Sequence, residues 1–500
     1  MNITELQQSY ASHPNVEGVC RLLKDNSVRH LYCGGLYASA ASLFSSVLVQ
    51  RATCPLVFIL GDMEEAGYFY HDLTQILGTE QVLFFPSSFR RAIKYGQKDA
   101  ANEILRTEVL SRLQKGEEGL CVVTYPDALA EKVVSRKELG DNTLKLHAGE
   151  RVDMNFVTDV LRSYGFEYVD YVYEPGQYAV RGSIIDVFSF SSEYPFRIDF
   201  FGDEVESVRT FEVETQLSKE KKESIVIVPD LSHSLEKKGS GGMVSFLDFL
   251  PSDSLLAMRD FLWLRERIQT VHDESLTPQA IAARESEENG AITLEGKLID
   301  GGEFTLRALD FRRMEFGNKP TGTPDATVSF HTTVQPIFHK NFDMVAESFR
   351  EYLSRHYTIY ICSDSLKQTD RIRAIFEDRG DNISFTAVER TLHEGFADDT
   401  LRICVFTDHQ LFDRFHKYNL KSDKARSGKV ALSLKELNQF TPGDYVVHTD
   451  HGVGRFAGLV RIPNGDTTQE VMKIVYQNED VVFVSIHSLH KVSKYKGKEG

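Results

Sequence analysis

The 500-residue sequence has little of what would indicate a membrane protein or a secreted protein. No window approaches the about 18 consecutive apolar residues that a membrane-spanning helix needs, so we expect no membrane partner. The start, Met-Asn-Ile-Thr-Glu, has no basic segment followed by an apolar one, and we expect no signal peptide. The six cysteines include no Cys-x-x-Cys pair, and several lie in apolar runs typical of buried strands. These absences predict a cytoplasmic chain with reduced thiols.

Basic residues are also scarce. The chain has 57 Lys and Arg against 73 Asp and Glu, which gives a formal net charge of −16. Phosphate contacts need Lys and Arg, so this balance disfavours general nucleic-acid binding while leaving local basic patches open. Two such patches occur, one formed by Arg90, Arg91, Lys94 and Tyr95, and one over residues 491–498, which is also typical of a solvated connector.

The composition that remains is that of a folded protein with several domains. Hydrophobic residues make up 41% and charged residues 26% of the chain, as in ordinary globular proteins, and the length predicts about three domains. Near the N-terminus, apolar runs at 55–60, 82–85 and 120–124 predict buried strands, while helical periodicity covers 63–77 and 97–115. Strands that alternate with helices indicate a parallel α/β sheet covered on both faces.

The pattern changes near residue 150, where short strands follow one another with glycine-containing turns between them. After a predicted helix over 153–164, strands are expected at 168–173, 178–181, 184–188, 196–201 and 205–211. This segment is therefore predicted to be a mainly antiparallel insert.

A second α/β unit is expected from about residue 328, and a different module near the C-terminus. In the second α/β unit, helices are predicted over 342–355 and 365–377, and strands over 358–362 and 401–406. A polar, basic stretch over 420–428 is typical of a linker. Short strands are then expected at 445–448, 458–462, 471–476 and 481–486, which favours a small SH3-like or Tudor-like barrel.

The sequence lacks a working nucleotide-binding motif. Only the stretch that begins at Gly34, after the apolar run 30–33, resembles a phosphate-binding loop. Where such a loop needs Gly, Lys and then Ser or Thr, this sequence has Ser39, Ala40 and Ala41. The Lys that neutralises phosphates and the hydroxyl that holds Mg²⁺ are both missing. We therefore expect no nucleotide cofactor in this chain.

Metal and nucleophile motifs are equally weak. Two His-x-x-His pairs, His448 with His451 and His487 with His490, lie in the C-terminal module, which contains no cysteine. Zinc needs four ligands in consistent geometry, so we expect barrel histidines that are exposed or hydrogen-bonded, and no metal. No Gly-x-Ser-x-Gly elbow or catalytic cysteine context occurs, and we expect no catalysis in these 500 residues.

What remains is a binding surface on the predicted strand 196–201. Alternation places Phe196, Ile198 and Phe200 on one face and Arg197, Asp199 and Phe201 on the other. If the first face packs inward, the second exposes an arginine beside an aromatic ring, which is typical of an interface anchor. A second buried face, or an Arg197–Asp199 pair, fits the pattern equally well. Arg181, before Gly182, is similarly ambiguous.

Two regions of the sequence resemble a known bacterial family. The stretches 174–188, EPGQYAVRGSIIDVF, and 195–209, PFRIDFFGDEVESVR, resemble the UvrA-binding domain shared by UvrB and the transcription-repair coupling factors. The stretch 442–458, PGDYVVHTDHGVGRFAG, resembles the RNA-polymerase-interacting domain of the coupling factors and of CarD-type regulators. UvrB lacks this barrel, so the combination resembles the N-terminal region of the coupling factors.

The resemblance implies a multidomain α/β architecture. Its expected segments are a UvrB-like α/β domain with a degenerate P-loop (1–145), a UvrA-binding insert (146–228), a second UvrB-like segment (229–325), a small α/β domain (328–428) and a CarD-like β-barrel (435–500). In the family an ATP-driven DNA translocase follows the barrel. That motor would carry ATP, Mg²⁺ and most DNA contacts, and its motifs do not occur here. The damage-probing aromatic hairpin of UvrB has no room between Pro86 and residue 97, so damage sensing is not expected.

The resemblance also implies partner contacts. Arg181 and Arg197 match the family arginines that contact UvrA, and Phe201 matches an aromatic beside them. This match favours exposure of the two arginines.

In the family the barrel binds the RNA polymerase β subunit through an edge strand. Here that strand would present Leu459, Arg461 and Ile462. The expected function is an adaptor that recruits UvrA to stalled polymerase for nucleotide excision repair. Two alternatives stay open: a UvrB-type helicase-like repair enzyme, against which the degenerate P-loop argues, and a CarD-like transcription regulator, against which the insert motif argues.

Overall fold

The computed structural model describes residues 1–88, 100–213, 215–231, 242–275, 296–420, 440–448, 450–464, 467–477, 479–485 and 492–495. The chain forms two compact units, one from residues 1–97, 109–135 and 243–420 and the other from 98–108, 136–242 and 421–500. The basic patch around Arg90, the linker at 421–428, His487, His490 and the ends of the 491–498 patch lie outside the described residues.

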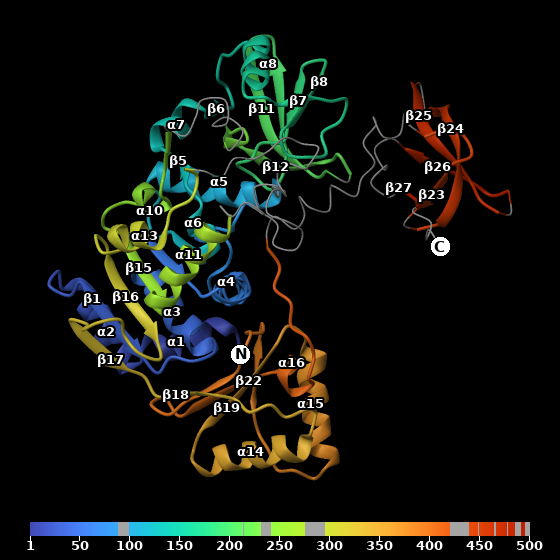
Figure 1. Cartoon of the computed structure of the whole chain (residues 1–500). Helices are drawn as coiled ribbons and strands as arrows, with labels where there is room; N and C mark the ends of the chain where they lie inside the picture. The colour runs from blue at the N-terminus through green and yellow to red at the C-terminus, as the bar shows by residue number, and fades with distance from the viewer. Residues whose placement is uncertain are drawn as a thin grey trace. The chain divides into compact units, whose positions relative to one another are not determined.

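A seven-stranded parallel sheet forms the centre of the first unit (Figure 1). Its strands are β1 (His30–Gly34), β2 (Leu56–Ile59), β3 (Val82–Phe84), β4 (Cys121–Thr124), β15 (Leu255–Arg259), β16 (Arg312–Gly317) and β17 (Ala326–Ser329). The spatial order is β17-β1-β16-β15-β2-β4-β3. Every residue of β2, β3 and β4 is buried, as expected for central parallel strands whose two faces are both covered. The predicted parallel α/β sheet is confirmed.

Helices cover both faces of this sheet. They are α1 (Ile3–Ala11), α2 (Pro14–Lys24), α3 (Ser39–Arg51), α4 (Met63–Leu77), α6 (Pro126–Ala130), α10 (Phe246–Phe249), α11 (Phe261–Ser275) and α13 (Gly301–Ala308). From β1 to β2 the chain moves toward the β3 edge, and from β15 to β16 it moves back toward the β17 edge. Right-handed crossovers therefore place α3 and α11 on opposite faces. Consistently, α3 packs with α4, and α11 packs with α6 and α13.

The first unit also contains a smaller five-stranded sheet. Its strands are β18 (Thr332–Val334), β19 (Thr358–Ser363), β20 (Thr386–Glu389), β21 (Phe396–Asp398) and β22 (Ile403–Thr407), in the order β18-β21-β22-β19-β20. Its helices are α14 (Phe342–Ser354), α15 (Leu366–Asp378) and α16 (Asp408–Leu411). The strands β20, β19 and β22 are parallel, whereas β21 and β18 run antiparallel. The second α/β unit expected from the sequence is confirmed.

The first helices of the chain are tied to this smaller sheet by a buried carboxylate. The Tyr10 hydroxyl donates a hydrogen bond of 2.8 Å to Asp398 Oδ2, and His13 Nε2 lies 3.4 Å from the same oxygen. Burial alone would raise the pKa of Asp398, but hydrogen bonds from His13, the Leu401 amide and Tyr10 outweigh it and hold the pKa below its ordinary value. Asp398 is fully buried, so these donors are what make its charge tolerable in the core.

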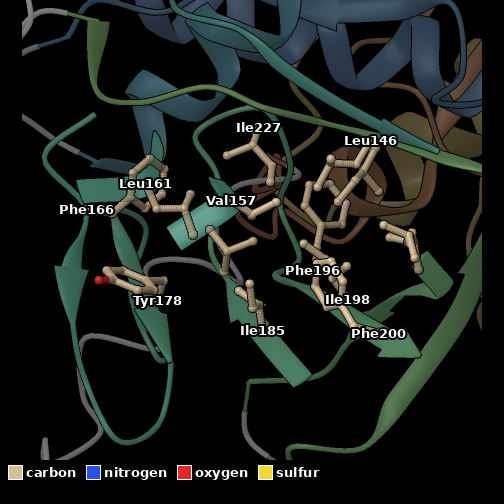
Figure 2. Close-up of a cluster of buried hydrophobic side chains, with 14 residues drawn as sticks. Leu146, Val157, Leu161, Phe166, Tyr178, Ile185, Phe196, Ile198, Phe200 and Ile227 are labelled. Carbon is tan, nitrogen blue, oxygen red and sulfur yellow. The ribbon is translucent and has the colours of Figure 1, made fainter. Parts of the chain in front are cut away.

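The insert is a six-stranded sheet in the second unit, with the order β12-β11-β10-β9-β8-β7. The strands are β7 (Glu167–Tyr168), β8 (Gln177–Arg181), β9 (Ile184–Val187), β10 (Phe196–Phe201), β11 (Glu204–Phe211) and β12 (Ser218–Lys222). All neighbours are antiparallel except β7 and β8. Helix α8 (Met154–Ser163) covers the sheet, and Figure 2 shows Val157, Leu161, Tyr178, Ile185 and Ile198 turned toward one another in the core.

One predicted strand of the insert is wrong. We expected a strand over 168–173, but only Glu167–Tyr168 is paired as a strand. The amides of Tyr173 and Glu174 instead donate to the side-chain Oε1 of Gln177, each at 3.0 Å. A side chain therefore supplies the acceptor that a neighbouring strand would otherwise provide.

The C-terminal module is a five-stranded antiparallel sheet. Its strands are β23 (Tyr445–His448), β24 (Gly452–Asn464), β25 (Thr467–Val475), β26 (Val481–Ser485) and β27 (Val492–Lys494), in the order β26-β25-β24-β23-β27. Its core contains Phe440, Val446, Phe456 and Met472. The sheet curls, and within the described part of the chain β26 and β27 are its two edges.

Four shorter strands and two further helices complete the described structure. They are β5 (Val133–Val134), β6 (Leu144–His147), β13 (Ser224–Ile227), β14 (Met243–Val244), α5 (Ala100–Lys115) and α7 (Arg136–Asp141). Among the described residues, no helix combines the length and apolar character that crossing a bilayer requires.

Candidate protein-docking sites

The two predicted UvrA-contact arginines of the insert share one buried carboxylate. Asp186 lies on β9 directly opposite Arg197 of β10, and its side chain is 1% exposed. Arg197 Nε donates to Asp186 Oδ1 at 2.7 Å and Arg197 Nη2 donates to Oδ2 at 2.9 Å. Arg181, at the end of β8, donates to the same Oδ2. Two guanidinium groups therefore neutralise one carboxylate across three adjacent strands, an arrangement with strong charge-assisted hydrogen bonds.

The exposure expected for these two arginines holds only in part. The Arg181 side chain is 34% exposed, whereas that of Arg197 is 13% exposed. Arg197 also donates to the Gln216 carbonyl at 3.0 Å and lies 4.5 Å above the centre of the Phe211 ring. The exposure of Arg197 that we expected is therefore wrong, because the packing and the ion pair cover most of its side chain.

The acidic partner of Arg197 also differs from the one considered in the sequence. Asp199 pairs with Arg209 at 3.3 Å, and the partner of Arg197 is Asp186. The alternation within the strand 196–201 does not reveal Asp186, because Asp186 lies on the neighbouring strand β9. Pairing the predicted strands 184–188 and 196–201 as a hairpin would have placed the two residues opposite one another.

Phe201 is the most exposed member of the predicted UvrA set. Its relative exposure is 79%, and it ends β10 just before the turn formed by Gly202 and Asp203. Gly202 has a φ of +64°, a left-handed conformation that glycine adopts readily. Phe196, Ile198 and Phe200 are buried in the core (Figure 2). The predicted inward face of this strand is confirmed. At the end of the strand, the Phe201 ring is exposed to solvent.

The predicted polymerase-contact residues lie on the half of β24 that has a free side. Strand β23 pairs only with residues 452–455 of β24, while residues 459–464 pair with β25 on the other side. Among the described residues, nothing pairs with the second side of 459–464. Arg461 is exposed, Ile462 is half-buried, and Leu459 packs partly against the barrel core. This segment can therefore accept an added strand although β24 as a whole is central in the sheet.

A second free edge competes with this one. Strand β26 is terminal in the described sheet, and its Val481 and Phe483 are 40% and 50% exposed. An edge with exposed apolar side chains is a template for pairing with another chain.

The degenerate P-loop lies between β1 and α3. The hydroxyls of Ser39 and Ser42 donate to Asp72 Oδ2 at 2.7 and 2.8 Å. The Ser39 amide donates to the Glu394 carbonyl at 3.2 Å, so the first amide of the helix is already paired with the chain itself. Ala40, which stands where a phosphate-binding loop has its Lys, is fully buried.

A cavity of about 430 Å³ lies beside this loop, at the carboxyl ends of β1, β2, β15 and β16. Open α/β sheets usually bind ligands at this end. Here the lining contains five carboxylates and one arginine, Arg259, which pairs with Glu65. The carboxylates belong to Asp62, Glu64, Glu65, Asp72 and Glu394. Burial raises the pKa of Asp72 to about 6. Such a lining repels a polyphosphate.

The histidine pair of the barrel is described only in part. His448 is buried, and its Nδ1 accepts a hydrogen bond of 3.1 Å from the Asp450 amide. His451 is exposed. His487 and His490 fall outside the part of the chain that the structure describes.

Comparisons with known proteins assign both modules. Residues 144–233 match the family model of the UvrB interaction domain, and residues 440–496 match that of the CarD-like/TRCF RID domain. The two folds and these matches define a chain that carries two interaction domains on an α/β scaffold.

The chain is also similar to whole proteins of one kind. The chain is 22% identical over 544 aligned positions to the transcription-repair-coupling factor of Bacillus subtilis (strain 168). It is 23% identical to the transcription-repair-coupling factors of two Staphylococcus aureus strains, bovine RF122 / ET3-1 and USA300. Each alignment covers 93% of this chain and 45% of the relative. The chain is thus similar to transcription-repair-coupling factors over most of its own length, as its motifs predicted, and it spans less than half of theirs.

Proposed function

We propose that this chain is a docking adaptor of transcription-coupled repair, which binds the RNA polymerase β subunit through its barrel and recruits UvrA through its insert. The observation that carries the proposal is the presence of both matched domains in one chain, with residues 144–233 preceding residues 440–496. A CarD-like transcription regulator would need only the second domain. A UvrB-type repair enzyme would need only the first.

The UvrA site that we propose consists of Arg181, Arg197 and Phe201. Phe201 offers an exposed apolar anchor, and aromatic rings with arginines dominate binding energy at many interfaces. Arg181 retains guanidinium N–H groups for a carboxylate of the partner, since its side chain is one-third exposed. Arg197 acts mainly by holding Asp186 and, through it, the orientation of Arg181.

The polymerase site that we propose is the unpaired side of residues 459–464. Main-chain hydrogen bonds along this side would supply affinity, and the alternating side chains of Leu459, Arg461 and Ile462 would supply specificity. The exposed guanidinium of Arg461 would favour an acidic neighbour on the β subunit.

Nucleotide chemistry is not part of the proposed function. We propose that the seven-stranded module is UvrB-like, that the curled sheet is an SH3-like or Tudor-like barrel, and that the loop at Gly34 binds no nucleotide. The acidic lining beside Ser39 and the buried alanine at residue 40 support the last of these proposals, the absence of nucleotide binding at this loop. ATP, Mg²⁺ and most DNA contacts would belong to a motor outside this sequence, and the proposed location is the bacterial cytoplasm.

Two binding measurements on one sample test the proposal. Purified chain is titrated calorimetrically with UvrA and, separately, with the RNA polymerase β subunit, and both titrations are expected to give saturable 1:1 binding. Binding to the β subunit without UvrA would favour the CarD-like alternative. An ATPase assay with and without DNA tests the third reading, and DNA-stimulated hydrolysis would favour a helicase-like enzyme.

A further inference from the structure

Four histidines from distant parts of the sequence meet in the first unit. His393 follows β20, His409 lies in α16, and His416 lies in the segment after it. One side-chain nitrogen from each of these three residues lies within 4.8 Å of the others. The fourth, His71 of α4, has its ring centre 5.0 Å from that of His416.

One contact in this cluster joins two ring nitrogens that cannot both keep a proton. His393 Nδ1 and His416 Nδ1 are 3.2 Å apart. Two imidazoles bound tetrahedrally to one metal at 2.0–2.1 Å would have nitrogens about 3.3 Å apart. The observed spacing therefore matches that of two ligands of one ion.

A backbone contact fixes which nitrogen of His409 is available, and the three rings lie nearly parallel, with interplanar angles of 13° to 24°. His409 Nε2 lies 2.7 Å from the His393 carbonyl oxygen. A carbonyl can only accept, so Nε2 carries the proton and Nδ1 keeps the free lone pair. The Asp72 carboxylate accepts from the His393 amide at 2.8 Å, and the Tyr68 ring stacks on that of His393 at 3.5 Å. A backbone carbonyl that fixes the tautomer of a ligand is typical of metal-bound histidine.

The protonation of the rings agrees with this geometry. Burial, and secondarily the neighbouring histidines, lower the pKa of His393 to about 4 and that of His416 to about 3. Burial also lowers the pKa of His71. Neutral imidazole is the form that binds metals.

A buried nitrogen of His71 without a hydrogen-bond partner in the described part of the chain is a second, independent indication of a bound ion. His71 Nδ1 is buried and has no hydrogen-bond partner among the described residues, which is costly for a polar atom unless something else satisfies it. Its Nε2 lies 3.2 Å from Gln75 Nε2, so the other nitrogen is the one available for a ligand.

We propose that His393, His409 and His416 bind a divalent transition-metal ion, with Zn²⁺ as the primary candidate and His71 or water as the fourth ligand. Imidazole nitrogens suit Zn²⁺, Cu²⁺ and Ni²⁺, whereas Mg²⁺ and Ca²⁺ prefer oxygen ligands. The site is independent of the proposed docking function. With His71 as the fourth ligand, the ion would connect α4 to the polypeptide on both sides of β21 and β22, and so join the smaller sheet to the larger one.

The test is a calorimetric titration of the metal-free full chain with ZnCl₂, alongside thermal unfolding with and without the ion. We expect one Zn²⁺ per chain and a higher Tm with Zn²⁺, since an ion that binds only the folded state stabilises it. MgCl₂ is expected to show no binding in the titration and to leave the Tm unchanged. The variants His416→Gln and His393→Gln are each expected to weaken Zn²⁺ binding at least about tenfold.

Two matched controls separate this site from adventitious binding. His331→Gln replaces an exposed histidine of the same unit, and His451→Gln replaces an exposed histidine of the barrel; both are expected to leave the affinity unchanged. X-ray absorption at the zinc edge of the wild-type chain is expected to count at least three imidazole nitrogens, a result that needs no variant to fold. Zn²⁺ binding that His416→Gln leaves intact, or a first shell dominated by oxygen, would overturn the proposal.

Discussion

Arg197 and Asp186 face each other across β10 and β9 and are joined by two parallel hydrogen bonds of 2.7 and 2.9 Å. The carboxylate is 1% exposed and the guanidinium 13% exposed, so the pair belongs to the interior of the insert as much as to its surface. A substitution at Arg197 therefore changes the stability of the domain as well as any contact with a partner.

We predict that Arg197→Ala lowers the free energy of unfolding of the insert by about 2–3 kcal/mol, because it leaves a buried carboxylate with Arg181 alone. Urea denaturation followed by circular dichroism measures this. Arg209→Ala, which removes the one-third exposed partner of Asp199, is the matched control and is expected to lose less than about 1 kcal/mol. Adding Asp186→Asn to Arg197→Ala should recover part of the stability. Equal losses for Arg197→Ala and Arg209→Ala would contradict the buried-pair interpretation.

Phe201→Ala is predicted to separate binding from stability. The ring is 79% exposed, so its removal leaves the Tm unchanged, while the loss of a central aromatic anchor weakens UvrA binding by at least about tenfold. Leu217→Ala removes another exposed apolar side chain of the same domain, 68% exposed, and should leave the affinity for UvrA unchanged. Isothermal titration with UvrA measures these affinities. Equal affinity of the Phe201→Ala and wild-type chains would exclude Phe201 from the proposed UvrA site.

The two free edges of the barrel lead to opposite expectations. Ile462→Arg is predicted to abolish pull-down of the polymerase β subunit, because it changes a half-buried apolar residue on the unpaired side of β24. Phe483→Ala, on the edge strand β26, is predicted to retain it. Loss of binding in Phe483→Ala alone would move the docking site to β26.

Acid is predicted to weaken the link that Asp398 makes with Tyr10 and His13. The pKa of Asp398 in the folded state lies below its ordinary value. Its stabilising contribution is therefore complete above the unfolded-state pKa of about 4 and is lost as the pH falls through the lower folded-state pKa. Asp398→Asn should cost about 1–3 kcal/mol at pH 7, and the difference from wild type should shrink below about pH 4. Unfolding curves at pH 7, 5 and 3 measure this, and a difference that stays constant would show that the carboxylate charge contributes nothing.

A close approach at Gly35 gives a further prediction. Both Gly35 and Gly78 have a left-handed backbone, with φ of +78° and +81°. A Cβ at Gly35 would lie 1.9 Å from the Phe330 carbonyl oxygen, whereas nothing lies within 4 Å at Gly78. Gly78 has a ψ of −177°, so Gly78→Ala should cost only the about 1–3 kcal/mol of this sparsely populated backbone conformation, and Gly35→Ala should cost clearly more. Equal melting temperatures of the two variants would argue against this packing of β1 on residue 330.

Local patterns in the sequence predicted most elements correctly. The helix over 63–77 is predictable because Asp62 caps it, with its side chain accepting from the Glu65 amide at 2.9 Å. The alternation of 196–201 predicted which side chains are buried, since a strand has only two faces. The expected strand at 168–173 failed because the Gln177 side chain, rather than a periodic pattern, sets that backbone.

The parts of the sites that could not be predicted depend on contacts distant in sequence. His71 and His416 are far apart along the chain, and no spacing rule connects them, so the histidine cluster leaves no motif. The same holds for Asp72, whose carboxylate holds Ser39 and the His393 amide. Such residues become visible only once the two sheets are packed.

The strand order of the larger sheet also determines how early β1 can pair with its neighbours while the chain is being synthesised on the ribosome. Strand β1 is the first to be made, yet its neighbours are β16 and β17, which emerge only after the entire insert has been synthesised. The nascent chain therefore carries an apolar strand with two unpaired sides until residues 312–329 have been synthesised, a state that is prone to aggregation. Truncated forms that end before residue 312 cannot complete the sheet around β1, and slow translation at the start of the insert would give chaperones time to shield that strand.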